Sequence, residues 1–147
     1  MRTLGILFVA LALCRTAVAG PLEDGFEALD HGDYATALQL LRPLAETGIP
    51  EAQISLGNMY FDGNGVPRDY AQSVKWYLLA ANHGNTEAQI ALGYLYQYGE
   101  AVRFDYVQAY KWFDLAGSNS DRDIVATKMT PAQIDEAQRL VREWKRN

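Results

Sequence analysis

The feature that most constrains this fold is a segment that repeats after 36 residues. Residues 51–57 read EAQISLG and return as EAQIALG at residues 87–93. Counted over the whole segment, about sixteen of the 36 positions are identical. A fixed period of roughly 20–50 residues is typical of solenoids, in which each unit packs against the next. The sequence therefore predicts a repeat array.

The first half of each repeat has the residue spacing of a helix. Ala52, Leu56 and Met59 fall on one apolar stripe of a helix predicted from Pro50 to Asp62. Gly63 is predicted to end this helix, because a glycine just past the last turn takes the left-handed conformation without strain. Gly99 has the same role one repeat later.

The second half of the repeat predicts a second helix. Asp69 can cap its first turn, Tyr70, Val74 and Tyr77 carry its apolar face, and Gly84 closes it. Two helices joined by a short loop form an αα-hairpin, and neither can bury its stripe alone. The predicted fold is therefore all-α, an α/α superhelix of antiparallel helix pairs.

The flanking sequence predicts the limits of the array. The repeats span about 21–49, 50–85 and 86–120, the first of them atypical, and a capping region covers 121–147. Within the cap we expect a short helix over about 121–128. A closing helix follows, signalled by Thr130, Pro131 and Gln133. Residues 20–147 are thus expected to form one solenoid domain.

Residues 1–19 have the layout of a secretory signal peptide. A cationic start at Met1–Thr3 precedes the apolar run Leu4–Leu13 and the small-residue signal Ala17–Ala19. The expected mature chain begins near Gly20 and is exported, periplasmic or secreted. No later run has the length needed to span a membrane.

A lipoprotein is the alternative for this segment. Leu11–Cys14 resembles a lipid-attachment box, although Leu13 stands where a small residue is usual. Cys14 is the only cysteine, so a chain beginning near Gly20 has no thiol or disulfide. It carries 11 basic and 18 acidic side chains, a net charge of −7, because Arg2 and Arg15 are removed. Nucleic acid is a poor partner for such a chain.

The repeated positions predict structure rather than chemistry. Trp76 and Trp112 recur at the repeat period and are interpreted as core anchors. Gly57 and Gly93 lie in mid-helix, where glycine costs about 1 kcal/mol, so we expect a close approach by a neighbouring helix. His31 and the second histidine, His83, suit the last turns of helices.

No pattern of a catalytic or cofactor site is present. No second His or Cys stands at metal-ligand spacing, and no serine lies in a nucleophile motif. There is no glycine-rich phosphate loop. The sequence therefore predicts no catalytic residue, no metal, no cofactor and no enzyme activity.

These residues resemble a known family of repeats. The pattern A-x-x-x-L-G-x-x-Y-x-x-G-x-G-V-x-x-D, followed by Trp76 and by A-A-x-x-G, is similar to the Sel1-like repeat (SLR), a relative of the tetratricopeptide repeat (TPR). The second copy departs from it at Ala101, Gly117 and Ser120, which indicates that the array ends there. The resemblance implies a TPR-like superhelix that serves as an adaptor for other proteins or cell-wall material.

Positions at which the two repeats differ are the candidates for recognition. In TPR-like stacks the first helix of each repeat lines the concave surface. The candidate partner-binding groove therefore consists of the differing first-helix residues, which are Asn58, Phe61, Asp62, Tyr94, Gln97 and Tyr98. The alternative is that Phe61 and Tyr98 merely cover the neighbouring hairpin.

Three functions follow from this reading. The first is an adaptor of the bacterial cell envelope that binds a protein or peptide on its concave face. The second is a hydrolase of cell-wall or β-lactam compounds, which the resemblance raises, although the members concerned resemble disulfide-rich chains. The third is a capping module that extends a partner's solenoid.

Overall fold

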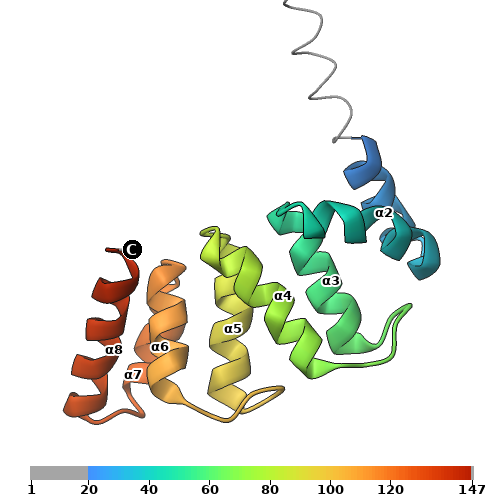
Figure 1. Cartoon of the computed structure of the whole chain (residues 1–147). Helices are drawn as coiled ribbons and strands as arrows, with labels where there is room; N and C mark the ends of the chain where they lie inside the picture. The colour runs from blue at the N-terminus through green and yellow to red at the C-terminus, as the bar shows by residue number, and fades with distance from the viewer. Residues whose placement is uncertain (1–19, 147) are drawn as a thin grey trace, which may run out of the picture.

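The structure is a computed structural model that describes residues 20–146. The predicted signal peptide and the lipidation alternative at Cys14 lie outside these residues. Within them no strand occurs, and helices follow one another along the chain (Figure 1). After a helical segment over residues 20–30 the helices are α2 (Tyr34–Glu46), α3 (Pro50–Asp62), α4 (Tyr70–Asn82), α5 (Thr86–Tyr98), α6 (Tyr106–Leu115), α7 (Asn119–Ala126) and α8 (Pro131–Trp144).

The repeat period is visible in how the helices begin. The carboxylates of Asp33, Asp69 and Asp105 each accept a hydrogen bond from the backbone amide three residues later, at 3.2, 3.1 and 3.1 Å. Each aspartate thereby satisfies a free amide of a first turn. α3 and α5 end at Gly63 and Gly99, whose φ angles are +76° and +70°. The predicted caps and helix ends are confirmed.

Within each hairpin the mid-helix glycine meets an aromatic ring of the partner helix. A Cβ atom on Gly57 would lie 2.7 Å from the ring of Tyr77, and one on Gly93 would lie 2.5 Å from the ring of Phe113. These distances are shorter than any van der Waals contact. The expected close approach is confirmed, and a side chain on α4 or α6 makes it.

Buried glutamines connect one repeat to the next. The Gln53 Nε2 atom donates to the carbonyl of Ala45 at 3.0 Å, and Gln89 Nε2 donates to that of Ala81 at 3.2 Å. Both carbonyls belong to the last turn of the preceding helix, which lacks intrahelical donors. A buried glutamine thus makes the same hydrogen bond to the preceding helix in both repeats.

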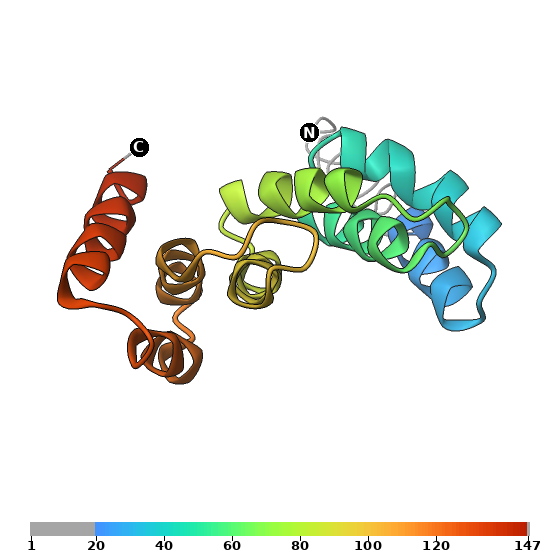
Figure 2. The same cartoon turned by 90° about the horizontal axis from the view of Figure 1, so that it is seen from below.

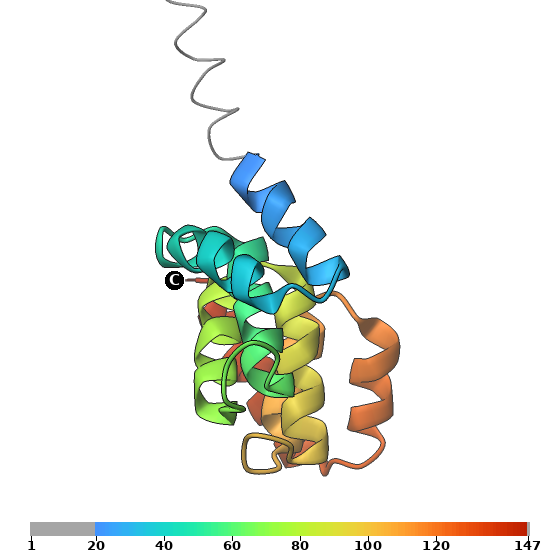
Figure 3. The same ribbon diagram turned by 90° about the vertical axis from the view of Figure 1, so that its right-hand side faces the viewer.

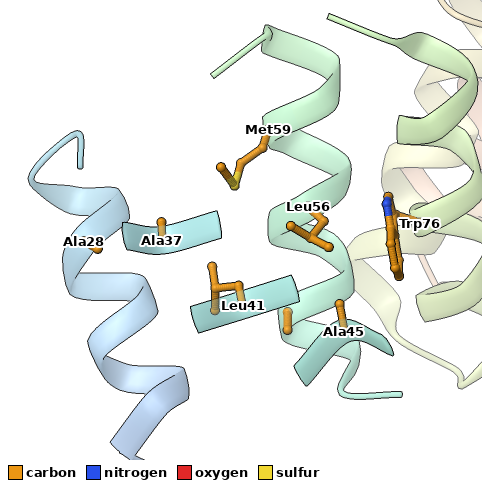
Figure 4. Packing of buried hydrophobic residues seen from close by; sticks show 8 residues of the cluster. Ala28, Ala37, Leu41, Ala45, Leu56, Met59 and Trp76 are labelled. Carbon is orange, nitrogen blue, oxygen red and sulfur yellow. The ribbon is translucent and has the colours of Figure 1, made fainter. Parts of the chain in front are cut away.

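The core consists of three hydrophobic clusters that follow one another along the solenoid. Figure 4 shows Ala28, Leu41, Leu56 and Trp76 in one cluster that joins residues 20–30 to α2, α3 and α4. A second cluster contains Trp112, and a third contains Phe113, Val125 of α7 and Ala137 of α8. Trp76 and Trp112 are 8% and 2% exposed, so their prediction as core anchors is confirmed.

The carboxy-terminal end departs from the repeat. α7 begins two residues before the predicted 121–128 span and ends at Ala126, where the Thr127 side chain donates to the carbonyl of Ile124. Residues 20–30 and α8 lie at opposite ends of the molecule (Figure 2). α7 lies on the side of the stack that α5 occupies, with α4 on the other side (Figure 3).

α8 closes the array through an aromatic contact. Thr130 and Gln133 form the predicted capping box at its start. Near its end the Trp144 ring lies 5.1 Å from that of Trp112 at 73°, an edge-to-face arrangement. The Lys111 Nζ atom lies 4.2 and 4.9 Å from the two ring centroids, and its burial lowers the pKa of Lys111.

Candidate partner-binding surface

The differing positions on α5 form an aromatic pair at the surface. The rings of Tyr94 and Tyr98 lie 6.1 Å apart and nearly parallel, at 9°. Tyr94 is 39% exposed and Tyr98 is 63% exposed. Residues four apart on a helix lie above one another, so the pair forms one continuous aromatic surface.

Contacts to α6 and α7 hold Tyr94 in place. Its ring packs edge-to-face on Phe113 at 5.1 Å, and its hydroxyl donates to Asp121 Oδ1 at 3.0 Å. Asp121 also accepts from the Ser118 hydroxyl at 2.6 Å. The hydrogen bond to Asp121 raises the pKa of Tyr94. The ring is thus fixed before any partner arrives, which lowers the entropic cost of binding.

The equivalent positions on α3 have other contacts. Asn58 is exposed and its amide oxygen accepts from the Tyr77 hydroxyl. Asp62 is also exposed, one turn further along. Phe61 is half-buried and its ring lies 5.2 Å from that of Tyr70 on α4. Phe61 therefore packs on its own hairpin, whereas the alternative interpretation had it cover the neighbouring one.

The six candidate residues thus divide into four groups. The structure brings Tyr94 and Tyr98 together and leaves Asn58 and Asp62 exposed at the corresponding positions of α3. It turns Phe61 toward α4. Gln97 is only 8% exposed, so its side chain does not contribute to the surface.

Sequence reasoning missed Asp121 and Phe113. Asp121 fixes Tyr94 from 27 residues away, a separation with no local periodicity. Phe113 stands where the first repeat has Tyr77. Between the two repeats, Tyr77 is replaced by Phe113 and Asn58 by Tyr94. This paired replacement is the sequence signal of the contact between the rings of Tyr94 and Phe113.

Other kinds of site have little support in residues 20–146. No group of three His, Cys, Asp or Glu residues that could hold a metal ion occurs there. The His31 Nδ1 atom lies 2.8 Å from the carbonyl of Glu27, and His83 follows the last residue of α4. In the same part of the chain, every helix is too short or too polar to cross a membrane.

Comparison with known proteins places this geometry in a family. The model of the Sel1 repeat matches residues 50–85, which hold α3 and α4, and residues 86–121, which hold α5, α6 and the first residues of α7. The chain belongs to the Sel1-repeat family. The Sel1-repeat fold is in general a scaffold for protein–protein interaction, since its repeats present extended surfaces.

Two solved Sel1-repeat structures resemble the chain. One is c5321, a protective antigen of uropathogenic Escherichia coli strains that displays an SLR fold. It aligns with a TM-score of 0.80 and 32% identity over 86% of this chain and 29% of its own. A Sel1 repeat protein from Oxalobacter formigenes aligns with a TM-score of 0.62 and 33% identity over 69% of this chain and 42% of its own.

This chain spans less than half the length of either structure. No curated protein matches it in sequence. The family and the TPR-like superhelix are therefore confirmed, while the partner is a matter for proposal.

Proposed function

We propose that this Sel1-repeat protein is an adaptor of the bacterial cell envelope that binds a protein or peptide on the surface formed by α3 and α5. The observation that supports this most is the Tyr94–Tyr98 pair, two exposed and parallel rings of which one is fixed by Asp121. Tyrosine is enriched at the centres of interfaces, because it combines a large apolar ring with a polar tip.

The neighbouring charges favour a polar or cationic partner. Asp62 is exposed on α3 at the position that Tyr98 occupies on α5. The chain as a whole carries 18 acidic against 13 basic side chains. A partner with basic or amide side chains beside an apolar residue would match these rings and carboxylates.

Export is the second part of the proposal and has its own test. The layout of residues 1–19 supports cleavage near Gly20 in the envelope. Mass spectrometry of the protein isolated from cell fractions should give a chain that begins near Gly20. A diacylated Cys14 would replace this with a lipoprotein, and an intact Met1 in the cytoplasmic fraction would remove the envelope location.

The binding surface is tested on a partner captured by crosslinking in the cell and then purified. Tyr98→Ala and the double variant Tyr94→Ala with Tyr98→Ala should weaken its binding about tenfold or more, because each removes a large ring from the interface. The Tyr98 variant should keep its helicity and melting temperature, since that side chain is mostly in water.

The matched control is Leu79→Ala, which removes a side chain 37% exposed on α4. It should leave the affinity unchanged. If the tyrosine variants bind as the wild type does, the surface on α5 is not the partner site. If Leu79→Ala weakens binding as much, the partner uses the opposite helix.

A further inference from the structure

A pocket opens where the last repeat meets the closing helix. Its volume is about 780 Å³, within the range of about 300–1,000 Å³ typical of ligand sites. It lies between the loop after α5, the start of α6 and the start of α8. The aromatic, cationic and amide residues of its lining are Tyr96, Arg103, Phe104, Tyr106, Gln108 and Gln133.

This pocket is separate from the Tyr94–Tyr98 surface. Tyr96 lines the pocket and lies two residues after Tyr94 on α5. The two side chains therefore point in directions about 200° apart around the helix axis. The two sites therefore face different sides of the same helix. Either can bind or fail to bind independently of the other.

An exposed aromatic ring lies at the mouth of the pocket. Phe104 is 49% exposed and packs edge-to-face on Tyr106, with ring centroids 4.3 Å apart at 72°. Half of a large apolar side chain thus remains in water at a concave site. Such a ring offers an edge-to-face or stacked contact to a second ring.

One exposed guanidinium at this pocket can pair with an anionic group. Arg103 lies exposed in the lining, and the Lys128 Nζ atom lies 5.7 Å from the Tyr106 ring centroid. The carboxylate of the lining, Asp105, accepts from the amides of Val107 and Gln108 at 2.9 and 3.1 Å and caps α6. Arg103 is the cationic side chain of the lining, and a guanidinium pairs well with a carboxylate.

Two side-chain amides in the lining can donate hydrogen bonds to a peptide backbone. The Gln133 oxygen accepts from the Thr130 amide at 2.9 Å, so its NH₂ group is the part left to donate. Gln108, half-buried in the same lining, carries a second amide. Extended peptides present a carbonyl at every residue, which such donors can bind.

The first repeat lacks these features at the same positions. Pro67 and Arg68 stand there in place of Arg103 and Phe104. The Arg68 side chain folds back and donates to the carbonyl of Asp62 at 3.3 Å. The pocket thus combines residues that only the second repeat carries with a closing helix that only this end has.

We propose that this pocket binds an extended peptide segment that presents an acidic side chain next to an aromatic one. The carboxylate pairs with Arg103, the aromatic ring packs on Phe104, and the peptide backbone accepts from Gln133. The site is a second contact point on the adaptor, distinct from the tyrosine surface.

The test is an NMR titration of the ¹⁵N-labelled protein, in the form that the cell accumulates, with capped hexapeptides. The first peptide has one glutamate followed by one phenylalanine between glycines, and two others replace the glutamate by glutamine or the phenylalanine by alanine. The first should shift the amides of residues 101–108 and 133 saturably. Each altered peptide should bind about fivefold or more weakly, since each lacks one of the two contacts.

Variants of the protein locate the site. Arg103→Ala should weaken the first peptide but not the glutamine peptide. Phe104→Ala should weaken both, because it removes the exposed ring and keeps the backbone and Cβ. Phe104→Arg, which restores the residue of the first repeat, should act like Phe104→Ala. Arg68→Ala at the matching position of the first repeat and Tyr98→Ala should leave binding unchanged.

Several outcomes would overturn the proposal. These are shifts that do not saturate, equal affinity for the glutamate and glutamine peptides, or full binding by both Phe104 variants. Shifts confined to Tyr94 and Tyr98 would assign the peptide to the α5 surface instead. A different result separates the two proposals. If the tyrosine variants bind the captured partner as the wild type does while this pocket binds the first peptide, the proposed function is refuted and this site stands.

Discussion

At the scale of single residues, the two repeats differ in compensated pairs. In the first repeat the Tyr77 hydroxyl donates to Asn58. In the second, Phe113 has no hydroxyl, and Tyr94 packs its ring on that side chain at 5.1 Å. A polar contact between the two helices of a hairpin is thus replaced by an aromatic one. The replacement places an aromatic ring at the surface of α5.

Tyr77 gives a prediction about pH. Its burial raises the pKa of Tyr77 to about 12, above the value near 10 of an exposed tyrosine. The folded state therefore retains the proton more tightly than the unfolded chain. The resulting stabilisation is complete below pH 10 and is lost as the pH rises towards 12. This one group should lower the free energy of unfolding by up to about 2–3 kcal/mol over that interval.

Urea titrations between pH 9 and 11 check this on the Tyr77→Phe variant, which should lose stability less steeply with pH than the wild type. At pH 7 the free energy of unfolding of this variant should be about 1 kcal/mol lower, because it lacks the hydrogen bond to Asn58. Asn58→Ala is the control, since it removes the bond but keeps the phenol buried. It should retain most of the alkaline slope. Equal slopes for wild type and Tyr77→Phe would contradict the assignment to burial.

At the scale of secondary structure, α8 is the element that differs most from the repeat. It begins with a capping box and has Pro131 in its first turn. It joins the array through Trp144 on Trp112 and through Ala137 and Val141, which are buried. Its solvent side carries an Arg139 ion pair with Glu136 at 2.6 Å. Exposed pairs of this kind contribute less than about 1 kcal/mol, so packing determines how α8 docks.

Trp144→Ala should therefore loosen α8. We expect a loss of about 2–3 kcal/mol in the free energy of unfolding, because the ring contact and part of a buried surface disappear. Hydrogen exchange should accelerate in residues 131–144 first. Arg142→Ala, on the exposed side of the same turn, should stay within about 0.5 kcal/mol of the wild type. A Trp144 variant as stable as this control would show that Ala137, Val141 and the capping box hold the helix without the ring contact.

At the scale of the whole molecule, each unit packs mainly on its neighbours. α3 packs on α4, α5 on α6 and α2 on α3. The stability of such an array is approximately a sum of local terms. The two ends can therefore respond differently to the same kind of substitution.

Leu41→Ala tests this locality. Leu41 is fully buried in the cluster that joins residues 20–30, α2 and α3, so its truncation should cost about 2–5 kcal/mol. We expect faster hydrogen exchange in residues 20–62 and little change in α8. Ile124→Ala, at a side chain 50% exposed on α7, should change neither end. Equal acceleration along the whole chain would indicate a fully cooperative domain instead.

Most of the fold could be predicted from local signals. Asp69 and Gly63 define helix ends through contacts with residues a few positions away, and the repetition of those signals defines the array. The candidate site was predicted less completely. Exposure follows from the helix stripe for Tyr98, but Gln97, one residue earlier, is buried. Its burial depends on which neighbouring helix covers it, and no residue pattern within α5 encodes that.

The sequence by itself determined the period, the paired helices, their caps and the family, because each of these depends on residues within one repeat. Only the tertiary structure decided which differing residues meet. It joined Tyr94 to Asp121, Trp112 to Trp144, and the loop after α5 to α8. These contacts link residues that lie 27 or more positions apart. They arise where the repeat meets the elements that end it, so periodicity carries no information about them.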